Sequence, residues 1–296
     1  MRKTTLYAIF LAASVLNGCT VKDMVPAVTG TEMSLVRRSE SFIPSTRGIV
    51  TGTTLTDDDS GDRTLYVTAY IHPQSGSEMN YLVNEPFEKD GTKWKHTPSI
   101  YWPVEATMDM LAYSAQQPFG DQHIDWKVPN GAEGMRIAVG DDRTRDDILY
   151  GAVWNGTDPG TSGTTITMHH SQAYIEFALA LKEGSSATCS VESIILKDTY
   201  LCGDLIIDNN AGLPQHRWDF RRYRASDNMV DDPDSVYGTT LTTVETSVSM
   251  LIPEQEMKTV TINYAVNGVH KTHDYELPHA NWLAGHNYIY KITLTD

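Results

Sequence analysis

The stretch Tyr174-Ile175-Glu176-Phe177-Ala178-Leu179 decides the fold class, because its bulky apolar side chains recur at every second position. Ile175, Phe177 and Leu179 would share one face of an extended strand, since successive side chains in a strand point to opposite faces. Near the C-terminus, Tyr288-Ile289-Tyr290-Lys291-Ile292-Thr293-Leu294 shows the same alternation. Such alternation is typical of antiparallel strands with one buried face. Outside the first nineteen residues no long stretch has the helical period of 3.6, so the sequence predicts an all-β protein.

Strand-like runs continue through the chain from Arg47 onward. β-branched runs alternate there with clusters of Gly, Pro, Asn and Asp, which favour turns. The Gly- and Thr-rich stretch at 156–164 is the clearest break, and it predicts a boundary between two β-sandwich domains at 47–160 and 161–296. The predicted strands cover residues 64–72, 79–83, 93–96, 108–114, 135–139, 148–154, 165–169, 173–181, 188–197, 201–207, 216–223, 239–251, 259–266, 271–277 and 286–294.

The first nineteen residues have the layout of an export signal. Arg2 and Lys3 precede an apolar run at 6–16, which is shorter than the ~20 residues that a membrane-spanning helix needs. Gly18 stands directly before Cys19, and this junction resembles the cut site of a bacterial lipoprotein signal. The resemblance implies cleavage between these two residues and a lipid on the Cys19 thiol. The alternative is an ordinary secretory signal with a chance cysteine.

The charge of the chain argues against two kinds of binding, and its composition fits a folded protein. The chain has 23 basic and 38 acidic side chains, and removal of residues 1–18 would leave 21 basic ones and a balance of −17. Such a negative field argues against binding to nucleic acid and against attachment to anionic lipid by charge. Hydrophobic residues make up 40% of the chain, enough for packed cores.

Six short motifs occur in order along the chain. They are Ile100-Tyr101-Trp102-Pro103, Met110-Leu111-Ala112-Tyr113-Ser114, Asp147-Ile148-Leu149-Tyr150-Gly151, His169-His170-Ser171-Gln172-Ala173, Leu251-Ile252-Pro253-Glu254-Gln255 and Ala284-Gly285-His286-Asn287-Tyr288-Ile289-Tyr290. Together with the lipoprotein-like signal, they resemble the fimbrillin family, the pilins of lipoprotein-derived fimbriae in Bacteroides-type bacteria. The resemblance implies two transthyretin-like β-sandwich domains in tandem.

The resemblance also implies a route of maturation through export, lipidation, transfer to the cell surface, proteolysis after an arginine, and assembly by strand exchange. Arg47, followed by Gly48, matches the cleaved position best, and Arg37-Arg38 is the competing site. A cut after Arg47 would remove the leader, residues 19–46, together with the lipid. Any strand that the leader contributes would then leave a groove, which a partner's strand could fill by main-chain hydrogen bonding. A surface arginine in a loop is the plain alternative for Arg47.

The expected function is that of a tip or accessory pilin in adhesion. Shaft members of the family carry additional C-terminal strands that they donate, whereas this sequence ends at Thr295-Asp296, directly after its last predicted strand. The expected partners are other pilin subunits, an unknown ligand on a host or bacterial surface, and the outer membrane through a lipid on Cys19 before maturation. The alternative is a non-polymerising surface lipoprotein that binds glycan.

No sequence motif indicates an enzyme, a metal or another cofactor. The acidic run at 57–62 resembles a calcium loop, but Thr68 stands where such a loop has its twelfth-position Glu. His169 and His170 are neighbours in a predicted strand, so their rings should point to opposite faces and be packed or hydrogen-bonded. The chain has no nucleophile elbow, no phosphate loop and no recognisable cysteine protease signature.

The sequence also gives expectations for a basic cluster around Trp218 and for two cysteines in the second half of the chain. Trp218 lies in the one basic cluster of the chain, which could face an acidic partner or pair internally with Asp219 and Asp227. The cluster contains Arg217, Arg221, Arg222 and Arg224. Cys189 and Cys202 fall in strands expected to form a hairpin that turns near residues 198–199. That hairpin would place Cys202 opposite Ile195, so two buried, unbridged thiols are expected.

Overall fold

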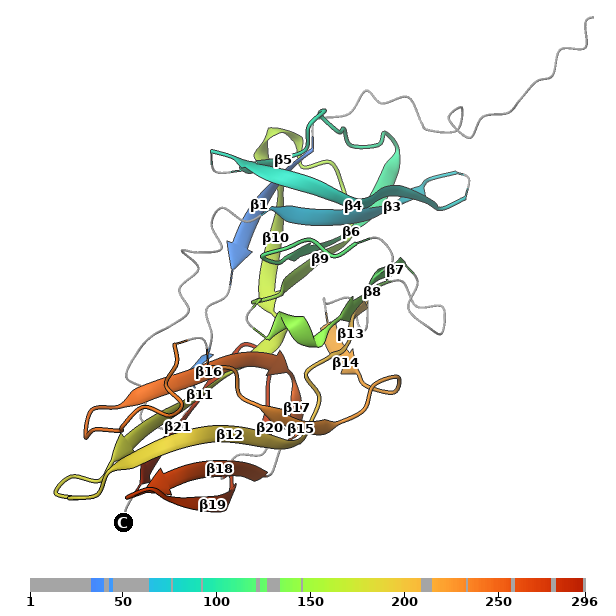
Figure 1. Ribbon diagram of the computed structural model, residues 1–296. Helices are drawn as coiled ribbons and strands as arrows, with labels where there is room; N and C mark the ends of the chain where they lie inside the picture. The colour runs from blue at the N-terminus through green and yellow to red at the C-terminus, as the bar shows by residue number, and fades with distance from the viewer. Residues whose placement is uncertain are drawn as a thin grey trace, which may run out of the picture.

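A computed structural model of the chain describes residues 33–39, 43–44, 64–75, 77–91, 93–120, 123–126, 134–144, 146–208, 215–232, 234–256, 259–277 and 281–294. Strands dominate these residues, joined by turns and by short 3₁₀ helices such as η3 (Asp141–Arg143) and η4 (Gly160–Ser162), so the all-β prediction is confirmed (Figure 1). None of the helices in this described part is long and apolar enough to cross a membrane.

A closed barrel forms the centre of the first half of the protein. Its core is apolar, with Leu65, Val67, Ala69 and Ile71 of one strand fully buried beside Trp102. The first and last strands pair with each other and so close the barrel. In spatial order the strands are β1 (Ser34–Ser39), β10 (Thr164–His170), β9 (Leu149–Gly156), β6 (Ala106–Ser114), β3 (Leu65–Pro73), β4 (Met79–Asp90) and β5 (Lys93–Lys95).

A second sheet packs against this barrel and draws its strands from both halves of the chain. Buried residues of the barrel, such as Leu111 and Tyr113, share one core with Ile137, Leu205 and Ile207 of this sheet. The order of its strands is β14 (Gln215–Asp219), β13 (Gly203–Asp208), β8 (Gly134–Val139) and β7 (Ile124–Trp126).

The second half of the protein contains the alternating stretch on which the all-β prediction rests. Ile175, Phe177 and Leu179 are fully buried against a facing sheet that supplies Ile194 and Leu196. One sheet has the order β16 (Thr246–Pro253), β11 (Gln172–Leu181), β21 (His286–Leu294) and β2 (Ile43–Pro44). The other has the order β15 (Ser226–Met229), β12 (Cys189–Thr199), β18 (Thr259–Val266) and β19 (Val269–Glu276), and a small sheet pairs β17 (Gln255–Glu256) with β20 (Asn281–Trp282).

The expected domain boundary at 156–164 lies within one sheet. β9 and β10, on either side of it, pair antiparallel, and Ile166 and Met168 of β10 belong to the barrel core. Their apolar side chains are buried there, so the chain leaves the barrel only after Met168 and enters the second core at Ala173. We therefore propose that the chain divides at about residue 171, with β13 and β14 counted in the first half.

The expected hairpin between the strands that carry Cys189 and Cys202 is wrong. β12 pairs with β15 and β18, whereas β13 pairs with β8 and β14 in another sheet. All six residues of β13 are buried, so its backbone groups need hydrogen-bond partners, and β8 and β14 supply them in place of β12. Cys189 is buried, as expected, whereas Cys202 is only half-buried. The two thiols form no disulfide.

A substitution at Gly151 should test how tightly β9 and β10 pack. A Cβ atom there would lie 2.5 Å from the carbonyl oxygen of Thr167 and 2.6 Å from Cγ2 of Ile166. Since a backbone oxygen cannot move unless the strands separate, Gly151→Val should destabilise the protein by about 3 kcal/mol, which lowers the melting temperature by roughly 6–12 °C. Thr165→Val, at an exposed position of β10, is the control and should melt like wild type. An unchanged melting temperature for Gly151→Val would contradict the close approach.

Candidate functional site

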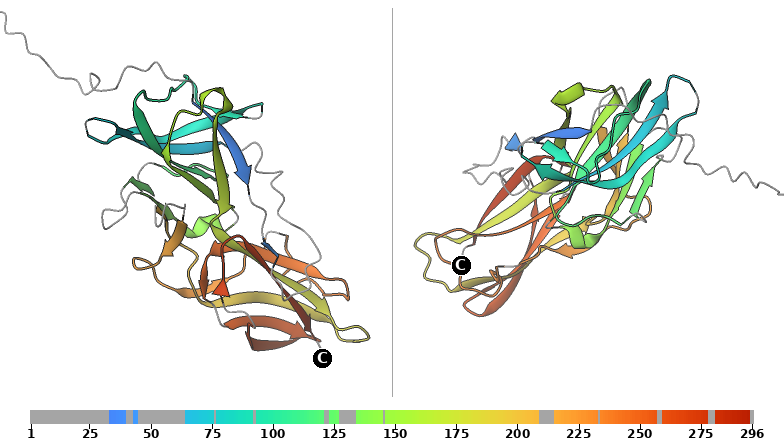
Figure 2. Two further views of the ribbon diagram at one scale, coloured as in Figure 1. Left: turned by 180° about the vertical axis from the view of Figure 1, so that it is seen from behind. Right: turned by 90° about the horizontal axis from the view of Figure 1, so that it is seen from above.

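The leader contributes a strand to each half of the protein. β1 runs parallel to β10 over five residue pairs, from Leu35 opposite Thr164 to Ser39 opposite Met168, and antiparallel to β5 over two pairs. β2 pairs parallel with β21, where Ile43 is opposite His286. Both leader strands appear in blue, β1 as a strand of the barrel and β2 at the second half (Figure 2). Part of the stretch 19–46 is therefore paired with strands of both halves.

Met33 anchors the start of β1 in the barrel. Its side chain is 1% exposed and belongs to the barrel core. Its backbone N–H donates a hydrogen bond of 2.7 Å to the carbonyl oxygen of Ile100, the first residue of the Ile100-Tyr101-Trp102-Pro103 motif. Trp102 of the same motif is fully buried in that core. Two residues of this motif therefore hold the start of β1, Ile100 through a hydrogen bond and Trp102 through the shared core.

Of the maturation sites expected from the sequence, the structure describes only Arg37-Arg38. Gly18, Cys19, Arg47 and Gly48 lie outside the described residues. Arg37-Arg38 lies within β1, where its backbone is opposite Ile166 and Thr167 of β10. Both leader strands precede Arg47 in the chain, and the next strand, β3, begins at Leu65.

The last described strand is fully engaged within its own sheet. β21 runs parallel to β11 over eight residue pairs, from Tyr174 opposite Asn287 to Leu181 opposite Leu294. Leu294 is 2% exposed and lies in the core of the second half. β21 is therefore part of the sheet and of the core that the second half of this protein forms by itself.

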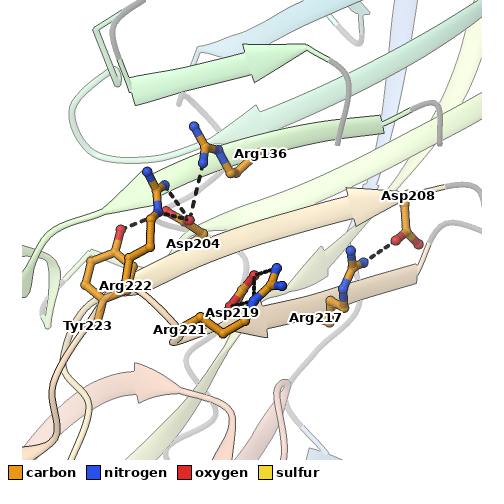
Figure 3. A network of polar contacts seen from close by, with 8 residues as sticks. All are labelled: Arg136, Asp204, Asp208, Arg217, Asp219, Arg221, Arg222 and Tyr223. Carbon is orange, nitrogen blue, oxygen red and sulfur yellow. Dashed lines mark hydrogen bonds and ion pairs between the residues drawn. The ribbon is translucent and has the colours of Figure 1, made fainter. Parts of the chain in front are cut away.

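Three arginines of the cluster form ion pairs with aspartates of β13 and β14 (Figure 3). Arg217 pairs with Asp208, and Arg221 pairs with Asp219. The buried Asp204 accepts hydrogen bonds from Arg222, at 3.1 Å from Nε, and from the Tyr223 hydroxyl at 2.7 Å. Arg136 lies 3.5 Å from Asp204 and also pairs with Asp125.

The internal pairing that the sequence left open is therefore confirmed for Asp219 but not for Asp227, which pairs with Lys197 at 2.7 Å. Hydrogen bonds from Arg221 lower the pKa of the Asp219 carboxyl to about 2, so it is ionised at neutral pH. Burial, together with the hydrogen bond to Asp204, raises the pKa of Tyr223. Each arginine of the network has an aspartate partner, so this face is close to neutral and is not a basic patch.

A shallow pocket of ≈ 630 Å³ lies beside this network. Its lining comes from β14, from the turn that follows β14, and from the connection between β12 and β13. The lining residues are Tyr200, Arg217, Trp218, Asp219, Phe220 and Arg221. The Trp218 and Phe220 rings rest over Gly203, where an added Cβ atom would lie 2.9 Å from the Phe220 ring. The indole N–H of Trp218 donates a hydrogen bond of 2.7 Å to the carbonyl oxygen of Ser171. The sequence indicated Trp218 but not Tyr200 or Phe220, which only the fold brings beside it.

The histidines are packed and hydrogen-bonded, as expected. His170 is buried, with its Nδ1 2.9 Å from Asp147, while the His169 ring packs against Tyr150 at 5.5 Å between ring centres. A hydrogen bond of 2.8 Å joins the Tyr150 hydroxyl to His216 Nδ1, and burial lowers the pKa of His216.

The described residues also give no sign of a metal centre. Within the part of the chain that the structure describes, no three His, Cys, Asp or Glu residues are placed to hold a metal ion. The acidic run at 57–62 lies outside that part. Thr68 is the twelfth residue counted from Asp57, where a calcium loop would have its Glu. It is buried and accepts a hydrogen bond of 2.9 Å from the backbone N–H of Asn84.

Comparison with known proteins places these features in a family. No match was found among the curated proteins. Two solved structures, each titled a "putative cell adhesion protein", are similar in fold. The structure from Bacteroides uniformis has a TM-score of 0.53 at 11% identity and covers 90% of this chain and 93% of its own. The structure from Bacteroides ovatus has a TM-score of 0.50 at 12% identity and covers 89% and 92%.

At these identities the two structures support the fold alone. The family model for fimbrillin-like proteins matches residues 50–296, which is most of the chain, from just after Arg47 to the C-terminal residue. The protein therefore belongs to the fimbrillin-like family.

Proposed function

We propose that this protein is a fimbrial subunit, a tip or accessory pilin, that reaches the cell surface as a lipoprotein and joins other pilin subunits by strand exchange. Its family is one of fimbrial and adhesion proteins of the cell surface rather than of enzymes. The observation that carries the proposal is the barrel closed by β1, a strand of the leader, between β10 and β5.

The position of the leader strands favours Arg47 over Arg37-Arg38 as the maturation site. A protease needs an accessible stretch of backbone, and backbone paired within a sheet resists cutting. Arg37-Arg38 is paired along β1. A cut there would also split β1 and leave β2 on the body, whereas a cut after Arg47 severs both strands from the body.

Loss of the leader would open a place for a partner's strand. The edges of β10 and β5 that β1 joins would lose their main-chain partners, and unpaired backbone groups are costly to leave buried. An incoming strand would regain these hydrogen bonds if it ran parallel to β10 and antiparallel to β5. Because β21 is paired with β11 along its length and Leu294 lies in the second core, this subunit would accept a strand rather than donate its last described one, as we expect of a subunit at a tip.

Limited proteolysis of the purified precursor tests this proposal. Dilute trypsin should trim the precursor to a product that begins at Gly48. That product, freed of its leader, should bind the C-terminal strand peptide of a shaft pilin, and the uncut precursor should not. A trimmed product that polymerises on its own would contradict the tip role and indicate a shaft pilin.

The lipid anchor has its own test. Cys19→Ala should abolish incorporation of labelled fatty acid and leave the chain unprocessed at the signal, because the Cys19 thiol would be the acyl acceptor. Cys202→Ala is the matched control and should be labelled like wild type. Membrane association and labelling that survive Cys19→Ala would show that this cysteine is not the lipid site.

A second candidate function is that of a non-polymerising surface lipoprotein that binds glycan, and the aromatic pocket beside β14 favours a glycan ligand. The two functions differ in the fate of the leader. A tethered binder should keep Cys19 joined to the folded body, whereas N-terminal sequencing of a polymerising subunit from native cells should begin at Gly48.

A further inference from the structure

We propose that the pocket beside β14 binds a neutral glycan, and this inference rests on the proposed place of the protein at the cell surface. Six residues line the pocket, and they combine three aromatic rings with two arginines and one aspartate. The pocket is open to solvent along one side of the molecule and has a volume of ≈ 630 Å³, which suits one or two sugar rings of a longer chain.

The aromatic side chains form a stack with nearly parallel rings. The ring centres of Tyr200 and Phe220 are 4.4 Å apart with an angle of 14° between their planes. Those of Trp218 and Phe220 are 6.4 Å apart with an angle of 5°. All three side chains are only half-buried, so part of each ring reaches the pocket. A pyranose ring has an apolar face of C–H groups, and aromatic rings of this kind offer it an apolar, amphipathic contact surface.

The charged side chains offer the polar contacts that sugar hydroxyls require. A hydroxyl group both donates and accepts hydrogen bonds, while a guanidinium only donates and a carboxylate only accepts. Arg217 and Arg221 bring donors to the lining of the pocket, and Asp219 brings an acceptor. The Arg217 and Arg221 side chains are 47% and 75% exposed, which leaves guanidinium N–H groups open to a ligand.

The charge balance of the pocket favours a neutral ligand over an acidic one. Arg217 is already paired with Asp208, and Arg221 with Asp219. An acidic sugar would have to compete with these carboxylates, and the net charge of −15 on the chain repels anions at longer range. A neutral sugar needs no such displacement, because it can share the ion pairs through its hydroxyl groups.

The pocket is held in shape by contacts on the side away from solvent. Gln255 accepts a hydrogen bond of 2.9 Å from the backbone N–H of Tyr200 and donates one of 2.8 Å to its carbonyl oxygen. Trp218 is fixed by its hydrogen bond to Ser171, and Gly203 gives the rings of Trp218 and Phe220 room to lie flat. A pocket fixed before binding loses little conformational entropy when a ligand arrives.

An array of printed neutral, sialylated and sulfated oligosaccharides tests the proposal with the full-length protein. The protein should bind a subset of the neutral probes, and the strongest of these should then be titrated by isothermal calorimetry. Arg221→Ala and Tyr200→Leu should each weaken that binding at least tenfold. Arg224→Ala, which changes an exposed arginine outside the pocket lining, is the matched control and should bind like wild type. Melting temperatures within about 2 °C of wild type would show that each variant is folded.

Three results would overturn the proposal: no binding to any probe, preferential binding to sialylated or sulfated probes, or wild-type binding by folded Arg221→Ala. Binding of the shaft peptide to the trimmed product is measured separately. Arg221→Ala should leave that binding unchanged, since the pocket is built from Tyr200 and β14 whereas the leader groove lies between β10 and β5. Failure of strand exchange and failure of glycan binding are therefore distinguishable.

Discussion

A precursor that carries Arg47→Ala should remain uncut and should be absent from surface fibres. Both leader strands precede Arg47, so an intact chain keeps β1 in the barrel as an intramolecular strand. A partner's strand would have to compete with a segment of the same chain, whose effective concentration is in the millimolar range for a short tether. N-terminal sequencing should find no form that begins at Gly48, and immunogold labelling of cells should leave the surface fibres unlabelled.

Arg38→Ala is the matched control for this prediction. It removes an arginine of the competing site while leaving the backbone of β1 able to pair with β10. This variant should be cut after Arg47 and assemble like wild type. If Arg47→Ala assembles normally and Arg38→Ala does not, the maturation site is in β1 and the assignment to Arg47 is wrong.

Stripping the leader from the trimmed protein should lower its melting temperature by about 10 °C or more. Loss of Met33 would leave a cavity in the barrel core, and truncation of a buried methionine costs about 2–5 kcal/mol. Loss of the β1 hydrogen bonds adds about 1 kcal/mol for each bond whose groups water does not replace. Each kcal/mol corresponds to roughly 2–4 °C for a domain of 150–250 residues.

A peptide of residues 33–44, added in trans, should restore the lost stability, because it carries Met33 and both leader strands. A peptide of the same composition in scrambled order is the control and should have no effect. Hydrogen exchange should report the same change locally, with β10 amides protected in the precursor, exposed in the stripped protein and protected again with the peptide. A stripped protein that melts like the precursor, with β10 still protected, would show that the leader strand does not hold the barrel closed.

Much of the sheet structure is predictable from the sequence, because most strands carry one buried face. The alternation at Ile175, Phe177 and Leu179 predicts the buried face of β11 correctly. The same reasoning predicts the first and last residues of β3, β12, β18 and β21 to within a few positions. The connection between β18 and β19 is also encoded locally, since Asn267-Gly268 is a typical two-residue hairpin turn and both residues have positive φ, 51° and 78°.

The leader strands could not be predicted in this way. β1 pairs with β10 on one side and with β5 on the other. These main-chain hydrogen bonds can hold β1 in place without an alternating pattern of apolar side chains in its own sequence. The sequence Ser34-Leu35-Val36-Arg37-Arg38-Ser39 shows no such alternation. The pairing of β13 with β8 was equally hidden, because it joins residues about seventy positions apart and no local signal specifies the partner.

The exchange of β13 and β14 into the first half has a mechanical consequence for a subunit that works under tension. A pull that separates the two halves would not simply extend a linker at residue 171. It would load six residue pairs between β13 and β8, together with the Asp204 ion pairs, at the same time. The β13–β14 hairpin should therefore hold the two halves together under load. Force applied at one end of the molecule should reach the other end before the halves separate.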